Sequence, residues 1–177
     1  MNDVTSAIEH DSVAKLNSLI KQGVDLNKAI LIGEEYDLEE YDEVSPLFYA
    51  IRKHASLEMI ELILENGVDV HSTDNEGISA LDMAIKFKRK DLIQFFLDKG
   101  FDINSTERKS GILPLLLASC FSDTELIQIL LDNGADINAV DTSGMSAKDY
   151  ARKLGQKGVV AYLNERGGKH SLYPEEE

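Results

Sequence analysis

Five short segments of the chain resemble one another, and their regular spacing constrains the fold more than any other feature. In chain order they are Lys21–Asn27, Glu65–His71, Asp98–Asn104, Asp132–Asn138 and the degraded copy Glu165–His170. Their first glycines lie at positions 23, 67, 100, 134 and 167, so the steps between them are 44, 33, 34 and 33 residues. A period of about 33 residues predicts a stack of similar helical units.

An amphipathic pattern precedes each of these glycines. Leu57, Ile60, Ile63 and Leu64 recur at i, i+3, i+6 and i+7, and the last three of these columns are apolar in the next two units as well. This spacing predicts one apolar face of an α-helix. The glycine that follows readily adopts the left-handed conformation in which helices commonly end.

A shorter helix is predicted ahead of each of the long ones. The starts of these short helices are Ser45, Ser79, Leu113 and Ser146. Serine is a preferred N-cap, and the proline after Ser45 and after Leu113 suits the first helical position. The repeating unit is therefore a turn, a short helix, a longer helix and a glycine.

This unit resembles the ankyrin repeat family. The pattern of that family is a turn, then Thr-Pro-Leu-His-x-Ala-Ala, then an apolar helix that ends in Leu-Leu-x-x-Gly-Ala-Asp-Val-Asn. The resemblance covers roughly residues 4 to 169. It implies an all-α solenoid of about five stacked helix pairs joined by short turns or hairpins. It also implies a protein-binding role, although the family binds many unrelated partners.

We expect one repeat domain over residues 1–169 and an acidic tail, predicted to be frayed, over residues 170–177. Terminal repeats expose a face that inner repeats bury, so polar residues in apolar columns indicate caps. Lys15 and Ser18 stand in such columns near the start, and Lys148 and Asn164 do so near the end. The predicted divisions are a cap at 1–28, an acidic insertion at 29–44, repeats at 45–71, 72–104 and 105–138, and a cap at 139–169.

The insertion accounts for the one long step between glycines. Of the ten residues from Glu34 to Glu43, seven are acidic and two are tyrosine. Long loops in compact domains are often functional or disordered. One interpretation is a solvated acidic loop. The other is an arm that docks in a basic cleft of a partner, which the tyrosines favour because aromatic residues are enriched at interfaces.

Charge and composition exclude several classes of protein. The formal net charge is −14, which repels phosphate backbones and argues against nucleic-acid binding. No apolar run approaches the ~20 residues needed to span a membrane, and the N-terminus lacks the features of a secretory signal. The single cysteine, Cys120, cannot form an internal disulfide, which fits a reducing compartment. We therefore expect a cytoplasmic protein that binds neither nucleic acid nor membrane and is a monomer when free.

No motif for catalysis, cofactor binding or metal binding separates from the repeat pattern. Asp141–Gly144 resembles an aspartic-protease motif but is one residue too long, and it fits the repeat turn. The four histidines lack zinc-type spacing, and the acidic insertion lacks the glycine of a calcium-binding loop. A phosphate-binding glycine loop is also missing. We therefore predict no enzyme activity, no cofactor and no metal.

The family commonly grips its partners with the turn tips and with the C-terminal ends of the short helices. Alignment of the repeats places several apolar residues at these columns, and contiguous exposed apolar groups mark interaction sites. Packing of these side chains between neighbouring repeats is the alternative. Together with the insertion, the candidate partner-binding residues are Glu34, Glu35, Tyr36, Asp37, Glu39, Glu40, Tyr41, Asp42, Glu43, Arg52, Lys53, Asn75, Glu76, Ile78, Lys86, Phe87, Lys109, Ile112, Phe121 and Met145.

The resemblance leaves more than one function open. A small acidic ankyrin protein resembles an inhibitor of a dedicated partner with a basic cleft, similar to the bacterial immunity proteins that neutralise a toxin. The alternatives are an adaptor that joins two proteins without inhibition, and a host-directed effector.

Overall fold

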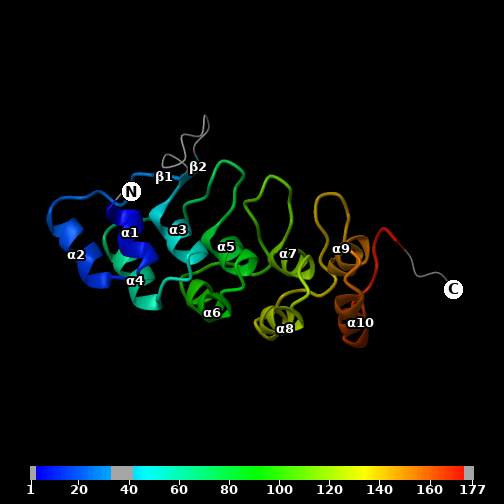
Figure 1. The fold of residues 1–177 in the computed structure, drawn as a ribbon. Helices are drawn as coiled ribbons and strands as arrows, with labels where there is room; N and C mark the ends of the chain where they lie inside the picture. The colour runs from blue at the N-terminus through cyan, green and yellow to red at the C-terminus, as the bar shows by residue number, and fades with distance from the viewer. Residues whose placement is uncertain (1–2, 33–41, 174–177) are drawn as a thin grey trace. The chain divides into compact units, whose positions relative to one another are not determined.

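A computed structural model of the protein describes residues 3–32 and 42–173, which form ten α-helices and one short hairpin (Figure 1). The chain divides into two compact units, Met1–Ser72 and Thr73–Glu177. The helices follow one another as a short and a longer member of each pair. The all-α solenoid architecture predicted from the repeat is confirmed.

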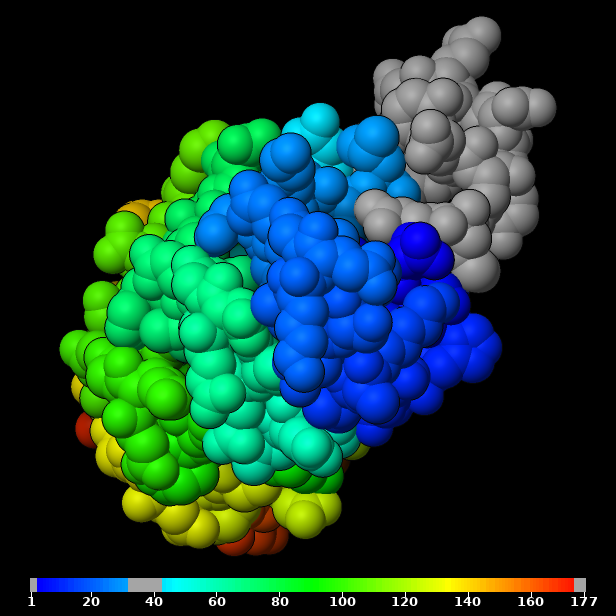
Figure 2. Space-filling view, turned by 90° about the vertical axis from the view of Figure 1, so that its left-hand side faces the viewer, coloured from blue at the N-terminus to red at the C-terminus, as the bar shows by residue number. Residues whose placement is uncertain are grey.

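The first unit contains two helix pairs and the hairpin. Its elements are α1 Asp3–Glu9, α2 Val13–Lys21, β1 Ile30–Ile32, β2 Asp42–Val44, α3 Pro46–Arg52 and α4 Leu57–Glu65. Within this unit α1 packs on α3, and α2 packs on α4. In Figure 2 the blue segment that contains α2 lies against the blue-green segment that contains α4.

The second unit contains three helix pairs. Its elements are α5 Ala80–Lys86, α6 Lys90–Asp98, α7 Pro114–Ser119, α8 Thr124–Asp132, α9 Ala147–Lys153 and α10 Lys157–Glu165. The short helices α5, α7 and α9 stack in one row, and the longer helices α6, α8 and α10 stack in a second row. The connections that lead into α7 and α9 project on one side of the unit, away from the row of longer helices (Figure 1).

The helix ends follow the predicted local signals. Ser45, Ser79 and Ser146 cap α3, α5 and α9, and each serine side chain accepts a hydrogen bond from the backbone N–H three residues later. After the longer helices the predicted glycines have positive φ, as at Gly67 (91°) and Gly134 (88°). These ends depend on interactions within a few residues, which is why the sequence predicts them.

The central residues of the predicted apolar faces form the cores of both units. Ile60 and Ile63 are fully buried, as are their counterparts in α6 and α8. Leu57, by contrast, is 41% exposed, so its assignment to the buried face is wrong. It is the first residue of α4, directly after the N-cap Ser56, and Met59 takes the buried position in that turn.

The start of the C-terminal tail is held to the last repeat, so the prediction of a frayed tail is wrong for residues 170–172. Asp149 Oδ2 accepts hydrogen bonds from the backbone N–H groups of Ser171 at 2.9 Å and Leu172 at 3.1 Å. His170 Nδ1 lies 2.8 Å from Asp149 Oδ1. Buried polar groups need hydrogen-bond partners, and the carboxylate of Asp149 is fully buried. The backbone N–H groups of the tail supply two of those partners.

Candidate functional site

Three turn tips form a continuous ridge in the second unit. Asp74 and Asp141 organise two of these tips, because each carboxylate accepts hydrogen bonds from the backbone N–H groups two and four residues later. The tips also contact each other. The backbone N–H of Lys109 donates to the carbonyl oxygen of Glu76 at 3.0 Å, and Thr142 Oγ1 donates to that of Ser110 at 3.3 Å. We call residues 74–78, 107–112 and 141–145 the tip ridge.

Most predicted tip residues lie at the surface of this ridge. Asn75, Glu76 and Lys109 are exposed, and Ile78 and Ile112 are half-buried. Lys109 Nζ lies 3.3 Å from Glu76 Oε1, so two of the proposed contact residues form a surface ion pair. Such exposed pairs contribute little stability, which leaves both side chains able to exchange partners.

Met145 is an exception, because it is only 6% exposed and the expectation of an exposed apolar tip residue is wrong there. Val140 pairs with Ser146 in an isolated antiparallel bridge. This pairing turns Met145 into the unit, while Val140 stays 45% exposed. We therefore leave Met145 out of the accessible surface.

An accessible apolar row lies at the C-terminal ends of the short helices of the second unit. Phe87 and Leu154 are the C-cap residues of α5 and α9, and Phe121 follows the C-cap of α7. The two phenylalanines are half-buried, and Leu154 is 52% exposed. Lys86 Nζ lies 5.7 Å from the centroid of the Phe87 ring. The same repeat position thus carries an apolar side chain at the surface three times in succession, and we call these residues the apolar row.

Polar side chains between the row and the ridge serve the fold. Tyr150 donates a 2.6 Å hydrogen bond to Asp141 Oδ2. Burial alone would raise the pKa of Asp141, but the hydrogen bonds from Tyr150, Ser143 and Met145 outweigh it and hold that pKa below its usual range. Arg108 Nη1 lies 3.6 Å from Asp82 Oδ1. The Asp141 carboxylate therefore remains an ionised acceptor that fixes the turn before α9, and the Asp82 carboxylate closes the capping box at the start of α5.

The cysteine near the apolar row is not poised for reaction. Burial raises the pKa of the Cys120 thiol, and the positive charge of Arg108 only partly opposes this rise. Cys120 Sγ lies 3.4 Å from the carbonyl oxygen of Leu116. A thiol with a raised pKa is a poor nucleophile, so Cys120 serves as a small, weakly polar packing residue.

The first unit holds its predicted contact residues differently. Arg52 is exposed, but Lys53 Nζ lies 2.8 Å from Glu9 Oε1 and 5.2 Å from the centroid of the Tyr49 ring. Tyr49 also donates a 2.6 Å hydrogen bond to Glu9. The hydrogen bonds from Lys53 and Tyr49 lower the pKa of Glu9, and the bond to Glu9 raises the pKa of Lys53. Lys53 is therefore held in an ion pair with Glu9 of the same chain, which it would have to leave in order to contact a partner.

The acidic insertion starts and ends in the short hairpin; the sequence predicted turns or hairpins between helix pairs, but not a hairpin at the base of the insertion. The antiparallel pairs are Ile30–Val44, Leu31–Glu43 and Ile32–Asp42, and the side chain of Glu43 is exposed. A three-residue apolar run at Ile30–Ile32 was the available signal. The candidate residues Glu34, Glu35, Tyr36, Asp37, Glu39, Glu40 and Tyr41 lie outside the described residues, and of Asp42 only the backbone is described.

Two of the four basic residues in the segment 86–90 are held in ion pairs. Arg89 is only 5% exposed and forms a 2.7 Å ion pair with Asp91. Lys90 Nζ lies 3.0 Å from Asp123 and 2.6 Å from Glu125. The hydrogen bonds to Glu125 and Asp123 raise the pKa of Lys90. Lys90 therefore joins α6 to α8 through its ion pairs.

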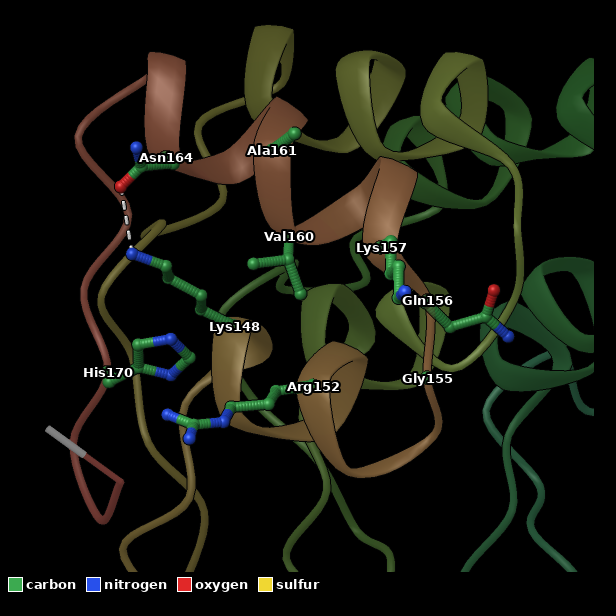
Figure 3. A pocket seen from close by; sticks show the side chains of 9 residues that line it. All are labelled: Lys148, Arg152, Gly155, Gln156, Lys157, Val160, Ala161, Asn164 and His170. Carbon is green, nitrogen blue, oxygen red and sulfur yellow. Dashed lines mark hydrogen bonds between the residues drawn. The ribbon is translucent and has the colours of Figure 1, made fainter. Parts of the chain in front are cut away.

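The sequence analysis missed a hollow at the last helix pair. Residues of α9, α10 and the following segment line a cavity of about 630 Å³ (Figure 3). Two of its lining residues, Lys148 and Asn164, are polar residues in columns of the repeat that are otherwise apolar. This replacement of apolar by polar residues was the sequence signal that could have indicated the hollow.

Other classes of site find little support over residues 3–32 and 42–173. No group of three or more His, Cys, Asp or Glu side chains within these ranges is arranged to hold a metal ion. None of the helices described is both long enough and apolar enough to cross a membrane.

Comparison with known proteins agrees with this architecture. The profile of a family described as "Ankyrin repeats (3 copies)" matches residues 5–107 and 81–172. No curated protein matches the chain.

Proposed function

Because the chain belongs to the ankyrin repeat family, whose repeats generally mediate protein–protein interaction, we propose that it binds and inhibits one dedicated protein partner. We further propose that it acts without catalysis, as a cytoplasmic monomer that carries no cofactor or metal.

The apolar row of the second unit is the observation that carries the proposal. Phe87, Phe121 and Leu154 repeat at one position of three consecutive short helices. Large aromatic side chains dominate the binding energy of protein interfaces when a partner covers them. The tip ridge adds exposed polar side chains, such as Asn75 and Lys109. An apolar strip beside a polar rim is the usual composition of a protein-binding surface.

The acidic insertion supports the choice of an inhibitor over an adaptor. The segment Glu34–Glu43 carries seven carboxylates in a chain whose net charge is −14. Complementary charge accelerates association and favours basic partners. Enzymes that act on nucleic acids or phosphorylated substrates have basic clefts, and an acidic arm suits such a cleft. An adaptor function needs no such arm.

Paired alanine variants test the apolar row. The partner is first isolated from the native host by affinity pull-down with this protein. Phe87→Ala and Phe121→Ala should each weaken binding of that partner by about 5–30-fold, because interface aromatics contribute about 1–2 kcal/mol or more. Phe95→Ala is the matched control: Phe95 is also half-buried and has a lysine 5.3 Å from its ring centroid, but it lies on α6 in the row of longer helices. Binding is measured by calorimetry, and helicity by circular dichroism.

The same assay separates the possible outcomes. Loss of helicity in the Phe87 or Phe121 variant would mean that the ring belongs to the core, and equal weakening by Phe95→Ala would mean that the apolar row is not the binding face. The activity of the captured partner is measured alongside. If the protein is an inhibitor, the partner loses its activity when it is saturated with this protein. Full activity in the complex would instead favour the adaptor function.

A further inference from the structure

Charge is divided between the two rows of helices in the second unit. In the short-helix segments 80–88, 114–122 and 147–156, the exposed charged residues are Lys86, Lys88, Arg152 and Lys153, all of them basic. The two carboxylates of these segments, Asp82 and Asp149, are only 4% and 0% exposed. The row of short helices therefore presents positive charge in a chain whose net charge is −14.

The longer helices of the same unit carry mostly the opposite charge. Their exposed carboxylates are Asp91, Asp98, Glu125, Asp132 and Glu165, and Lys157 is their one exposed lysine. The helix dipole does not account for this division, because it favours cations at the C-terminal end of every helix. Yet α6, α8 and α10 each end in a carboxylate, and none of the three has a basic residue in its last turn. The cations of the short helices therefore belong to a particular surface and do not follow a general preference of helix ends.

Three of these cations flank the apolar row directly. Lys86 and Lys88 stand on either side of Phe87 in the sequence, and Lys153 precedes Leu154. Lys86 Nζ lies 5.7 Å from the centroid of the Phe87 ring. Among the residues that the structure describes, no carboxylate forms an ion pair with any of these three lysines. A partner that covers the row therefore meets positive charge beside its apolar contacts.

The spacing of the row suits a helical segment. The three apolar side chains stand on neighbouring helices, because α5 packs on α7 and α7 packs on α9 (Figure 1). Packed helices lie about 8–10 Å apart, so consecutive members of the row are separated by about that distance. Seven residues of an α-helix advance about 10.5 Å. A helix with apolar side chains seven residues apart therefore brings one of them to each member of the row.

The remaining charge of the chain favours a short peptide segment over a larger anionic surface. The chain carries 32 acidic and 18 basic residues, so it repels polyanions as a whole. The attraction of a few lysines is screened beyond a Debye length, about 8 Å at physiological ionic strength. A peptide can place a few carboxylates within that distance of the lysines. A nucleic acid or a membrane surface would extend beyond it and meet the carboxylates of the chain.

We propose that the apolar row, together with Lys86, Lys88 and Lys153, binds an acidic amphipathic helix of the protein partner. The apolar side chains of that helix cover the row, and its carboxylates pair with the three lysines. This inference rests on the proposed function, because it takes the apolar row as the binding surface. It adds the charge and the spacing of the segment that is bound there.

Two synthetic peptides test the charge of that segment. Both are helical, with about 15 residues and with leucines seven residues apart. One carries glutamates beside the leucines, and the other carries glutamines at the same positions. We expect the wild-type protein to bind the glutamate peptide at least about 10-fold more tightly, as measured by fluorescence anisotropy, because complementary charge sets specificity at an interface. The net charge of the chain alone would give the opposite order, and that order, equal affinity, or no binding of either peptide would overturn the proposal.

Charge reversal in the full chain locates the effect. The variant K86E/K88E/K153E should bind the glutamate peptide at least about 10-fold more weakly than the wild type does, because three attractive charges become repulsive. The matched control K21E/K99E/K157E changes the net charge by the same amount at the longer helices, and its loss should stay below about 3-fold because those charges are screened. Equal losses would mean that overall charge repels the peptide, which would reject the proposal. Circular dichroism checks helicity, and K86Q/K88Q/K153Q replaces the first variant, with the same expected direction, if that variant unfolds.

Binding of the isolated partner distinguishes the failure of this proposal from the failure of the proposed function. The lysine variant K86E/K88E/K153E and Phe87→Ala are compared in the same assay. Weakening by both supports the proposal. Weakening by Phe87→Ala alone would keep the row as the binding surface but reject an acidic segment, and weakening by the lysine variant alone would reject the apolar contact. No weakening by either variant would reject the row itself and, with it, the proposed function.

Discussion

At the scale of single residues, Asp149 makes the most consequential set of contacts. It closes the capping box of α9 with Ser146, and it also binds the backbone of Ser171 and Leu172 and the ring of His170. Burial alone would raise the pKa of Asp149. The hydrogen bonds from Ser146, Leu172, Ser171 and His170 outweigh burial and hold that pKa far below its ordinary value of 3.8.

We expect Asp149→Asn to destabilise the protein by about 2 kcal/mol or more, because hydrogen bonds to a charged acceptor contribute about 1.5–3 kcal/mol each. Asp82→Asn is the matched control, since Asp82 closes the same capping box in α5 without holding a tail. Urea unfolding should show a smaller loss for the control. Hydrogen exchange at Ser171 and Leu172 should accelerate only in the Asp149 variant, and unchanged protection there would contradict the assignment.

The sign of the pH dependence follows from the lowered pKa. A carboxyl group whose pKa is lower in the folded state stabilises that state above its unfolded pKa, here about 3.8. The contribution is lost as the pH falls below that value toward the folded pKa. The stability difference between the wild type and Asp149→Asn should therefore be full at pH 7 and shrink below pH 3.8. A difference that is constant with pH would exclude this linkage.

At the scale of elements, close approach of the turns decides which glycines are required. Gly77 and Gly134 have similar positive φ angles of 74° and 88°. A Cβ atom on Gly77 would lie 1.9 Å from the carbonyl oxygen of Glu107, in the next turn of the tip ridge. A Cβ atom on Gly134 would meet nothing within 4 Å. A side chain at position 77 is therefore disfavoured by both the contact and the backbone conformation, and one at position 134 by the conformation alone.

We expect Gly134→Ala to cost about 1–2 kcal/mol, the usual penalty for a left-handed alanine. Gly77→Ala should cost clearly more, because the ridge must also separate at the contact with Glu107. Denaturant unfolding of the two variants measures the difference. Equal losses would show that neighbouring tips separate without cost, and the ridge would then not be a rigid binding surface.

At the scale of the whole molecule, we expect the net charge of −14 and the acidic insertion to set the rate of association with a partner. The hairpin provides a clean place to remove the insertion, because Ile32 pairs with Asp42. Replacing residues 33–41 with Asp-Gly supplies a favoured two-residue hairpin turn and preserves this pairing. A second variant keeps the length but changes the acidic residues of 34–41 to amides. Together the two variants separate the effect of charge from that of shape.

We expect both variants to slow association with a basic partner by about 10-fold or more at low salt, since steering by charge raises association rates. The wild-type rate should fall between about 0.05 and 0.5 M salt, because the Debye length shrinks over that range. The neutral variant should lose most of this dependence. Stopped-flow kinetics provide the measurement. Equal rates and equal inhibition by all three proteins would remove the arm from the mechanism.

The sequence by itself determined the features that depend on neighbouring residues. The serine caps, the glycines that end the longer helices and the two helices of each unit all depend on contacts within about one helical turn. Such contacts are written directly into a short stretch of sequence. The repeat register also fixes which positions can contact a partner, so the sequence alone indicates Phe87, Phe121 and Lys109.

The tertiary structure alone decided which of those columns are covered. Met145 is buried by a bridge between Val140 and Ser146, and Lys148 is held by Asn164, sixteen residues away. Asp149 anchors residues 21 to 23 positions later. Burial and pairing of this kind depend on groups brought together only by packing. The register of a repeat fixes where a side chain points, but only its neighbours in space determine whether it meets solvent, a partner or the core.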